Sequence, residues 1–211
     1  MTLSEDTLED VVTGVGVATT CKGLAAIAEP ECGAAIWLRP QQPRFASWLD
    51  ALSPDQLPRA RVVLQPDRVQ DALGQIFDIS GMPGCKERDA LIRDACTLAK
   101  VFAGIMNAPY LRMRLDLVTT NACRKFHRDA VTARLVCTYR GTGTQYGVSN
   151  AGEDPEQILT TPTGSPIVLR GSLWPESPNS GLLHRSPPIE GTGETRSVMV
   201  LDPVFDLEDA D

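Results

Sequence analysis

The segment Leu111-Arg-Met-Arg-Leu-Asp-Leu-Val118 marks the point where the chain changes from a helical to a β-type pattern. Its apolar residues alternate with mostly charged ones, and side chains two positions apart lie on the same face of a strand. The alternation therefore predicts a half-buried strand over 111–118. Further short apolar stretches follow between clusters of glycine and proline, and they predict strands at 131–139, 167–170, 182–185 and 196–201.

The part of the chain before residue 109 contains most of the expected helix. A helix is predicted from 86 to 106, because apolar residues recur there at steps of four and three positions, as on one helical face: Leu91, Ala95, Leu98, Phe102 and Ile105. Shorter helices are expected at 44–52 and 67–77, and short strands at 33–39 and 61–64.

These patterns predict an α+β fold. We expect residues 1–108 to form a mixed, largely helical region that packs on one sheet of a β-rich core, and residues 109–205 to form that core. Short strands separated by glycine and proline are typical of a sandwich, a barrel or a jelly roll. A length of 211 residues fits one compact domain.

Composition argues against two classes of partner. The net charge is −7, and lysine and arginine are scattered without forming a stripe, so nucleic acid is not an expected partner. No run of about 18 apolar residues occurs, so a membrane is not expected either. The N-terminus begins with acidic residues, including Glu5 and Asp6, unlike a signal peptide, and we expect a cytoplasmic protein. The sequence leaves the oligomeric state open.

The two histidines are the strongest chemical signal in the sequence. His127 and Asp129 form an H-x-D pair, whose side chains share a face if the backbone is extended. His184, in another expected strand, is a candidate third ligand. Two histidines and one carboxylate leave neighbouring positions of a metal open, as in non-haem Fe(II) oxygenases, although the same donors also suit Zn²⁺. The six cysteines include no C-x-x-C pair, which argues against a zinc ribbon.

These residues carry a family resemblance. The segments Phe126-His-Arg-Asp129, Gly143-Thr-Gln-Tyr146, Leu182-Leu-His-Arg-Ser-Pro-Pro188 and Gly193-Glu-Thr-Arg196 resemble the Fe(II)/2-oxoglutarate-dependent oxygenases. The chain also looks like a bacterial family designated a domain of unknown function (1826), through Cys137-Thr-Tyr-Arg-Gly141, the Leu173-Trp-Pro175 turn and His184-Arg-Ser-Pro-Pro188. The resemblance covers residues 110–203.

The resemblance implies a double-stranded β-helix, which is a cupin-like, squashed barrel of two sheets. It also implies that His127, Asp129 and His184 hold Fe(II), and that Arg196 pairs with the distal carboxylate of 2-oxoglutarate as a cosubstrate. A planar, permanently charged guanidinium suits that pairing. One departure is Val198, because many members of the superfamily have serine or threonine two residues after this arginine. The implied reaction oxidises an unknown small-molecule or protein substrate while 2-oxoglutarate is converted to succinate and CO₂.

Strand parity adds a separate expectation about Tyr139. If the strand continues without a bulge from His127, Tyr139 shares its inward face and is placed to bind the cosubstrate. A core tyrosine with its hydroxyl at the rim is the alternative. The same parity points Arg134 and Arg140 outward, into solvent.

Two other functions compete with the oxygenase. One is a non-catalytic, cupin-like protein that binds zinc or iron and takes part in metal homeostasis. The other is a scaffold with a vestigial site. Arg196 favours the oxygenase, since metal storage or delivery needs no carboxylate-binding arginine.

Overall fold

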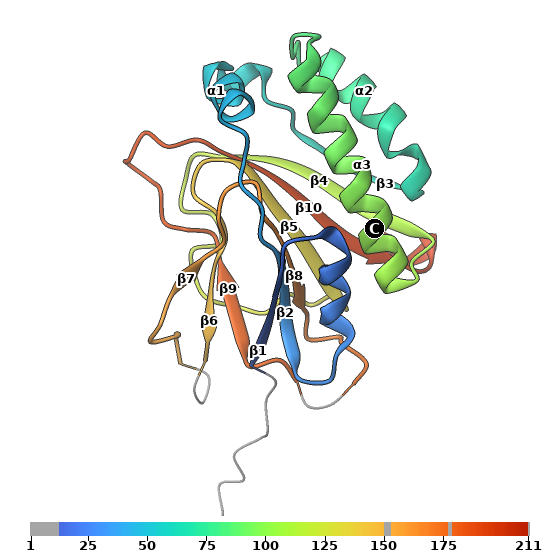
Figure 1. The fold of residues 1–211 in the computed structure, drawn as a ribbon, viewed down its shortest axis with the longest axis vertical. Coiled ribbons are helices and arrows are strands. Elements are labelled where there is room, and N and C mark those ends of the chain that lie inside the picture. Colours follow the sequence, from blue (N-terminus) through green and yellow to red (C-terminus); the bar gives the residue numbers. More distant parts are fainter. Residues whose placement is uncertain (1–12, 150–152, 177–178, 211) are drawn as a thin grey trace, which may run out of the picture.

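The computed structural model describes residues 13–149, 153–176 and 179–210, and it confirms an α+β fold (Figure 1). The acidic start of the chain lies outside the described residues. The α-helices are α1 (Pro43–Ala51), α2 (Val69–Ile79) and α3 (Lys86–Met106). The strands are β1 (Gly14–Ala18), β2 (Cys32–Trp37), β3 (Ala60–Leu64), β4 (Tyr110–Val118), β5 (Ala133–Arg140), β6 (Gln145–Val148), β7 (Leu159–Thr160), β8 (Pro166–Arg170), β9 (Leu182–Arg185) and β10 (Arg196–Val204). Short 3-10 helices span Cys21–Ala28, Pro54–Gln56, Pro66–Arg68 and Leu207–Ala210.

The strands form two sheets of unequal size. The large sheet has the order β1-β2-β8-β5-β10-β4-β3, and the small sheet has the order β7-β6-β9. Every pairing is antiparallel except the parallel pair of β1 with β2. Three strands from before residue 109 therefore belong to the large sheet: β1 and β2 at one edge and β3 at the other.

Helices cover one face of the large sheet. In Figure 1, α2 and α3 lie beside one another over the β3, β4 and β10 end of this sheet. The predicted helix 86–106 is confirmed, and its apolar face is buried through Leu91, Ala95, Leu98 and Phe102. These side chains share a core with Leu111, Met113 and Leu115 of β4 and with alternate residues of β5. This core, which we call the helix-side core, accounts for the alternation in the opening segment.

A second core lies between the two sheets. It combines Tyr146 of β6 and Leu182 of β9 with residues of the large sheet that include Val136, Val198 and Val200. We call this the barrel-side core. The two faces of β5 and β10 thus pack into different cores. Successive residues along either strand alternate between the helix-side core and the barrel-side core.

The large sheet does not extend without interruption from His127 into β5. His127 forms an isolated bridge with His184, and β5 starts only at Ala133. The pairing of β5 with β10 then shifts by one residue between Thr138 and Arg140, which is a β-bulge at Tyr139. The condition of an unbulged strand from His127 to Tyr139 is therefore not met, and Tyr139 does not share a face with His127.

No helix in the described part of the chain has the length and apolar character needed to cross a membrane.

Candidate metal centre

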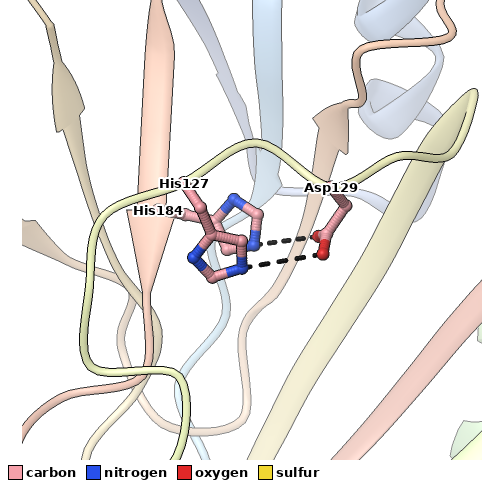
Figure 2. A group of neighbouring side chains, drawn as sticks. All are labelled: His127, Asp129 and His184. Carbon is pink, nitrogen blue, oxygen red and sulfur yellow. Dashed lines mark ion pairs between the residues drawn. The ribbon is translucent and has the colours of Figure 1, made fainter. Parts of the chain in front are cut away.

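His127, Asp129 and His184 converge beside β9, the edge strand of the small sheet (Figure 2). One ligand-type atom from each of the three side chains lies within 4.8 Å of the others. Figure 2 shows both imidazoles directed at the carboxylate of Asp129. The sequence therefore identified three residues that the fold brings together.

Backbone pairing places the two imidazoles next to each other. The amide of His127 donates to the carbonyl of His184 at 3.0 Å, and the amide of His184 donates back to His127 at 3.0 Å. Residues that exchange both hydrogen bonds in an antiparallel pair project their side chains to the same face. The ring centroids lie 4.6 Å apart as a result.

The end of β8 holds the segment that carries Asp129. The amide of Ser172 donates to the carbonyl of Asp129 at 2.9 Å, and the amide of Gly171 donates to Thr132 at 2.9 Å. A Cβ atom at Gly171 would overlap the carbonyl of Val131 and would lie 2.8 Å from that of Asp129. Only glycine allows the two backbones to approach this closely.

The distances suit a metal with three adjacent ligands. Nε2 of His184 lies 3.0 Å from Oδ2 of Asp129, and Nε2 of His127 lies 3.6 Å from Oδ1. Ligands about 2.1 Å from a metal and at right angles are about 3 Å apart. Oδ2 of Asp129 is buried and has no assigned hydrogen-bond donor among the described residues, and its 3.0 Å contact with Nε2 of His184 is an ion-pair contact. A cation would satisfy this oxygen, so the residues fit a divalent metal.

A backbone carbonyl orients the ring of His127. Nδ1 of His127 lies 2.8 Å from the carbonyl oxygen of Lys125, which requires Nδ1 to carry the proton. Nε2, which lies 3.6 Å from Oδ1 of Asp129, is then the ring nitrogen available to coordinate a metal once it is deprotonated. Metal-binding histidines commonly have their second ring nitrogen fixed in this way.

The three groups differ in their proton affinity. The contact with Asp129 raises the pKa of His127 above its ordinary value. Burial lowers the pKa of His184, against the opposing influence of Asp129. Burial alone would raise the pKa of Asp129, but both histidines and the charge of Arg134 outweigh it and hold that pKa well below its usual range. The centre thus combines a carboxylate that favours its charged form with two imidazoles of different proton affinity, of which His127 holds a proton more readily than His184.

Arg134 links the cluster to the interior of the large sheet. Its Nη1 donates to Oδ1 of Asp129, and its Nε and Nη2 donate to the two oxygens of Asp202 at 2.6 and 2.8 Å. Asp202 is only 2% exposed. The expectation that Arg134 points into solvent is wrong, because the break before β5 turns this residue toward the barrel side.

Arg196 lies at the start of β10, on the same face as Val198 and Val200. It is 1% exposed, and its guanidinium donates to the carbonyl of Thr142 at 2.6 Å, to Oγ of Ser186 at 3.0 Å and to Oγ1 of Thr138 at 3.3 Å. None of the described carboxylates lies within ion-pair distance of it. Burial lowers the pKa of Arg196 to about 10, partly offset by the charge of Glu194.

Tyr139 does not share a face with His127. It belongs to the helix-side core, and its hydroxyl donates to Oδ2 of Asp94 on α3 at 2.7 Å. Arg140 likewise reaches α1, where it donates to the carbonyls of Leu49 and Leu52 instead of pointing into solvent. Tyr139 continues the alternation of Ala133, Leu135 and Cys137 into the helix-side core, and the bulge turns Arg140 toward the helices as well.

Tyr146 is the tyrosine that lies beside the cluster. It pairs with His184 across β6 and β9 and contributes to the barrel-side core. Its hydroxyl has no hydrogen-bond partner among the described residues. The sequence contained a signal for it, because Gly143-Thr-Gln-Tyr146 is one of the segments with the oxygenase resemblance, but the segment is too short to reveal its parity.

Residues 18–202 match the family described as protein of unknown function (DUF1826). The chain belongs to this family. No curated protein matches its sequence. The fold is similar to that of dioxygenase for auxin oxidation 1 from Arabidopsis thaliana, solved as a 2-oxoglutarate binary complex, with a TM-score of 0.55 and 8% identity over 93% of this chain and 94% of that one. This DUF1826 member thus shares a fold with a 2-oxoglutarate-binding dioxygenase.

Two further oxygenase structures match at lower similarity. Dioxygenase for auxin oxidation from rice gives a TM-score of 0.48 at 11% identity, over 91% of this chain and 83% of that one. A member of the 2OG-Fe(II) oxygenase family from Burkholderia pseudomallei gives 0.47 at 13% identity, over 92% of this chain and 97% of that one.

Proposed function

We propose that this protein is an Fe(II)/2-oxoglutarate-dependent oxygenase. The observation that carries the proposal is the burial of Arg196, whose guanidinium has no carboxylate partner among the described residues. Arg196 donates a hydrogen bond to Ser186, which lies two residues after His184 of the metal cluster. A buried charge is costly unless it is paired. A bound dicarboxylate would supply the missing partner, whereas a protein that only stores metal has no need of one.

The two sheets are interpreted as a double-stranded β-helix. The large sheet presents β5, β10 and β8 to the small sheet, and the barrel-side core fills the space between them. The metal candidates lie at β9, while Arg196 lies at the start of β10. Both therefore belong to the barrel-side interior, as a cosubstrate that contacts metal and arginine would require.

Each residue has a separate task in this proposal. His127, Asp129 and His184 would hold iron, and bound iron would supply the redox chemistry that couples oxidation of 2-oxoglutarate to oxidation of a substrate C–H bond. Arg196 would bind the distal carboxylate of 2-oxoglutarate through its planar fork. Tyr146 would donate its unpaired hydroxyl to the cosubstrate beside His184.

Two hydroxyl groups compensate for Val198. Oγ of Ser186 and Oγ1 of Thr138 both accept from Arg196, and each can donate its own proton to a carboxylate bound there. The hydroxyl that many superfamily members place two residues after the arginine would thus come from β5 and from the segment after β9. These two hydroxyl groups support 2-oxoglutarate as the ligand of Arg196 despite Val198.

The alternative is a non-catalytic metal-binding protein. Two histidines and one carboxylate also form a typical Zn²⁺ site. That function would need the same three residues but neither Arg196 nor Tyr146, so the two proposals differ in what Arg196 contributes.

Anaerobic titration separates these proposals. Protein purified without a metal-binding tag is stripped, loaded with Fe(II) and titrated with 2-oxoglutarate, and the visible charge-transfer absorption of the chelate is recorded. We expect saturable binding that Arg196→Gln weakens by about 30-fold or more, since a charge-assisted hydrogen bond contributes about 2 kcal/mol. Arg93→Gln, on the exposed face of α3, removes the same charge as a control. Tight zinc binding with no response to 2-oxoglutarate would overturn the oxygenase and support the alternative.

A further inference from the structure

The barrel-side face of β4 carries two arginines near the metal centre. Leu111, Met113 and Leu115 enter the helix-side core, so Arg112 and Arg114 project from the opposite face. The sequence alone suggests no more than a solvated strand face. The structure makes this face unusual, because Arg114 is partly buried and its side chain is only 26% exposed.

The neighbouring strand adds a third guanidinium to the same face. Arg61 of β3 is directly opposite Arg114 in the antiparallel register, and it is exposed. Side chains of directly opposed residues start about 5 Å apart, and like charges in these positions are destabilising. The chain as a whole has a net charge of −7, so a local gathering of arginines is not a consequence of composition.

The carboxylate nearest to this pair is shared with another arginine. Asp202 forms a long ion pair with Arg114, at 4.0 Å from Nη2, while both oxygens of Asp202 accept hydrogen bonds from Arg134. Nε of Arg114 is buried and has no hydrogen-bond partner among the described residues. Asp116, on the same face, makes no ion pair with Arg61 or Arg114 in the described part of the chain. A buried guanidinium donor is thus left without an acceptor.

We infer that Arg61 and Arg114, together with Arg112, bind an oxyanion carried by the substrate, either a carboxylate or a phosphate. This inference rests on the proposed function. Arg134 connects the two sites, since it contacts Asp129 on one side and Asp202, next to Arg114, on the other. Adjacent strands are about 4.8 Å apart, so β4 lies about 10 Å across the sheet from β5.

The substrate is therefore an anionic molecule long enough to reach from the metal centre to the arginines of β4, which is two strands away from β5 in the large sheet. Guanidinium groups match the planar or tetrahedral array of oxygens in such a group better than other side chains do. Long-range attraction would add to the rate of capture, because the arginines are positive on a negatively charged protein.

The test uses two simple probes on the full-length, metal-free protein. Inorganic phosphate and acetate are titrated separately, and the backbone amide and arginine Nε signals of β3 and β4 are followed by nuclear magnetic resonance. We expect saturable shifts at Arg61 and Arg114, and a loss of affinity of about tenfold in Arg114→Gln. Tighter binding of phosphate than of acetate would assign a phosphate-bearing substrate, and the reverse order would assign a carboxylate.

Variants make the outcome decisive. Arg61→Gln changes an exposed residue on an edge strand and should weaken the same probe even if Arg114→Gln fails to fold. Arg93→Gln should leave the probe affinity unchanged. Equal shifts in the wild type and in both β-strand variants, or shifts only around Arg196, would overturn the inference. Metal and 2-oxoglutarate are absent from these titrations, so their result does not depend on whether the protein is an oxygenase.

Discussion

Arg134 donates hydrogen bonds to two acids at once: its Nη1 donates to Oδ1 of Asp129, and its Nε and Nη2 donate to the two carboxylate oxygens of Asp202 on β10. Burial alone would lower the pKa of Arg134, but Asp202 and Asp129 raise it, so the side chain stays charged. One oxygen of Asp129 is thereby occupied, and the other is free to bind metal. A carboxylate held in this way is a ligand through one oxygen only.

Substitution of Arg134 should weaken metal binding. Partners of metal ligands typically contribute about 10- to 100-fold in affinity, and we expect a loss of this size for Arg134→Gln in a Co²⁺ or Zn²⁺ titration. Arg134→Lys keeps the charge but cannot reach both carboxylates, so it should not restore affinity. Recovery with lysine would instead mean that charge alone matters, and unchanged affinity in both variants would remove any role for Arg134.

The two tyrosines form a matched pair for testing the cosubstrate pocket. Tyr146→Phe should weaken 2-oxoglutarate binding to the Fe(II)-loaded protein by about fivefold to tenfold, which corresponds to the loss of one neutral hydrogen bond. Tyr139→Phe should leave that affinity unchanged and destabilise the fold by about 1–2 kcal/mol, because the hydroxyl partner of Asp94 is lost. Titration and urea unfolding measure the two effects, and an exchange of the two outcomes would contradict the placement of both residues.

Metal affinity should depend on pH through His127. Its pKa is raised by Asp129, and only the neutral imidazole can coordinate a cation. Affinity should therefore fall as the pH drops through a value above 6.5, the ordinary value for histidine. His184 has a lowered pKa and stays neutral there. Calorimetric titrations between about pH 6 and pH 8 would show this dependence, and a flat profile would contradict it.

Gly171 is expected to control the position of Asp129. Gly171→Ala introduces a Cβ against the carbonyls of Val131 and Asp129, so the segment must move. We expect a loss of about 1–3 kcal/mol in unfolding free energy together with weaker metal binding. Gly74→Ala, in α2 with nothing within 4 Å of the added atom, is the control and should be neutral or stabilising. Unaltered metal affinity in a folded Gly171→Ala protein would argue against this role.

The sequence predicted the elements that have strong periodicity and enough length. The helix 86–106 and the strand at 111–118 were found because their apolar faces repeat over several turns or pleats. β1, β6 and β7 were missed. β6 and β7 have only four and two residues, and β1 is Gly-Val-Gly-Val-Ala, whose pairing with β2 depends on tertiary structure.

The candidate site was predicted in part. His127, Asp129 and His184 were found because histidine is rare in this chain and the H-x-D spacing is informative. The predicted orientations of Arg134, Tyr139 and Arg140 relative to His127 were wrong, because neither the break before Ala133 nor the bulge at Tyr139 has a local signal in the sequence. The role of Arg134 could not be foreseen either, because one of its partners, Asp202, is distant in the chain and becomes a neighbour only through the β5–β10 pairing.

The reciprocal backbone pairing of His127 with His184 affects which cation the protein would carry. A cation does not have to gather these imidazoles, since the peptide groups already hold them in place. A rigid set of two nitrogens and one oxygen discriminates little by shape, and its preference then follows the intrinsic order in which copper and zinc exceed iron. Occupancy by iron would therefore reflect supply within the cell, and protein prepared in ordinary buffers would be expected to collect zinc.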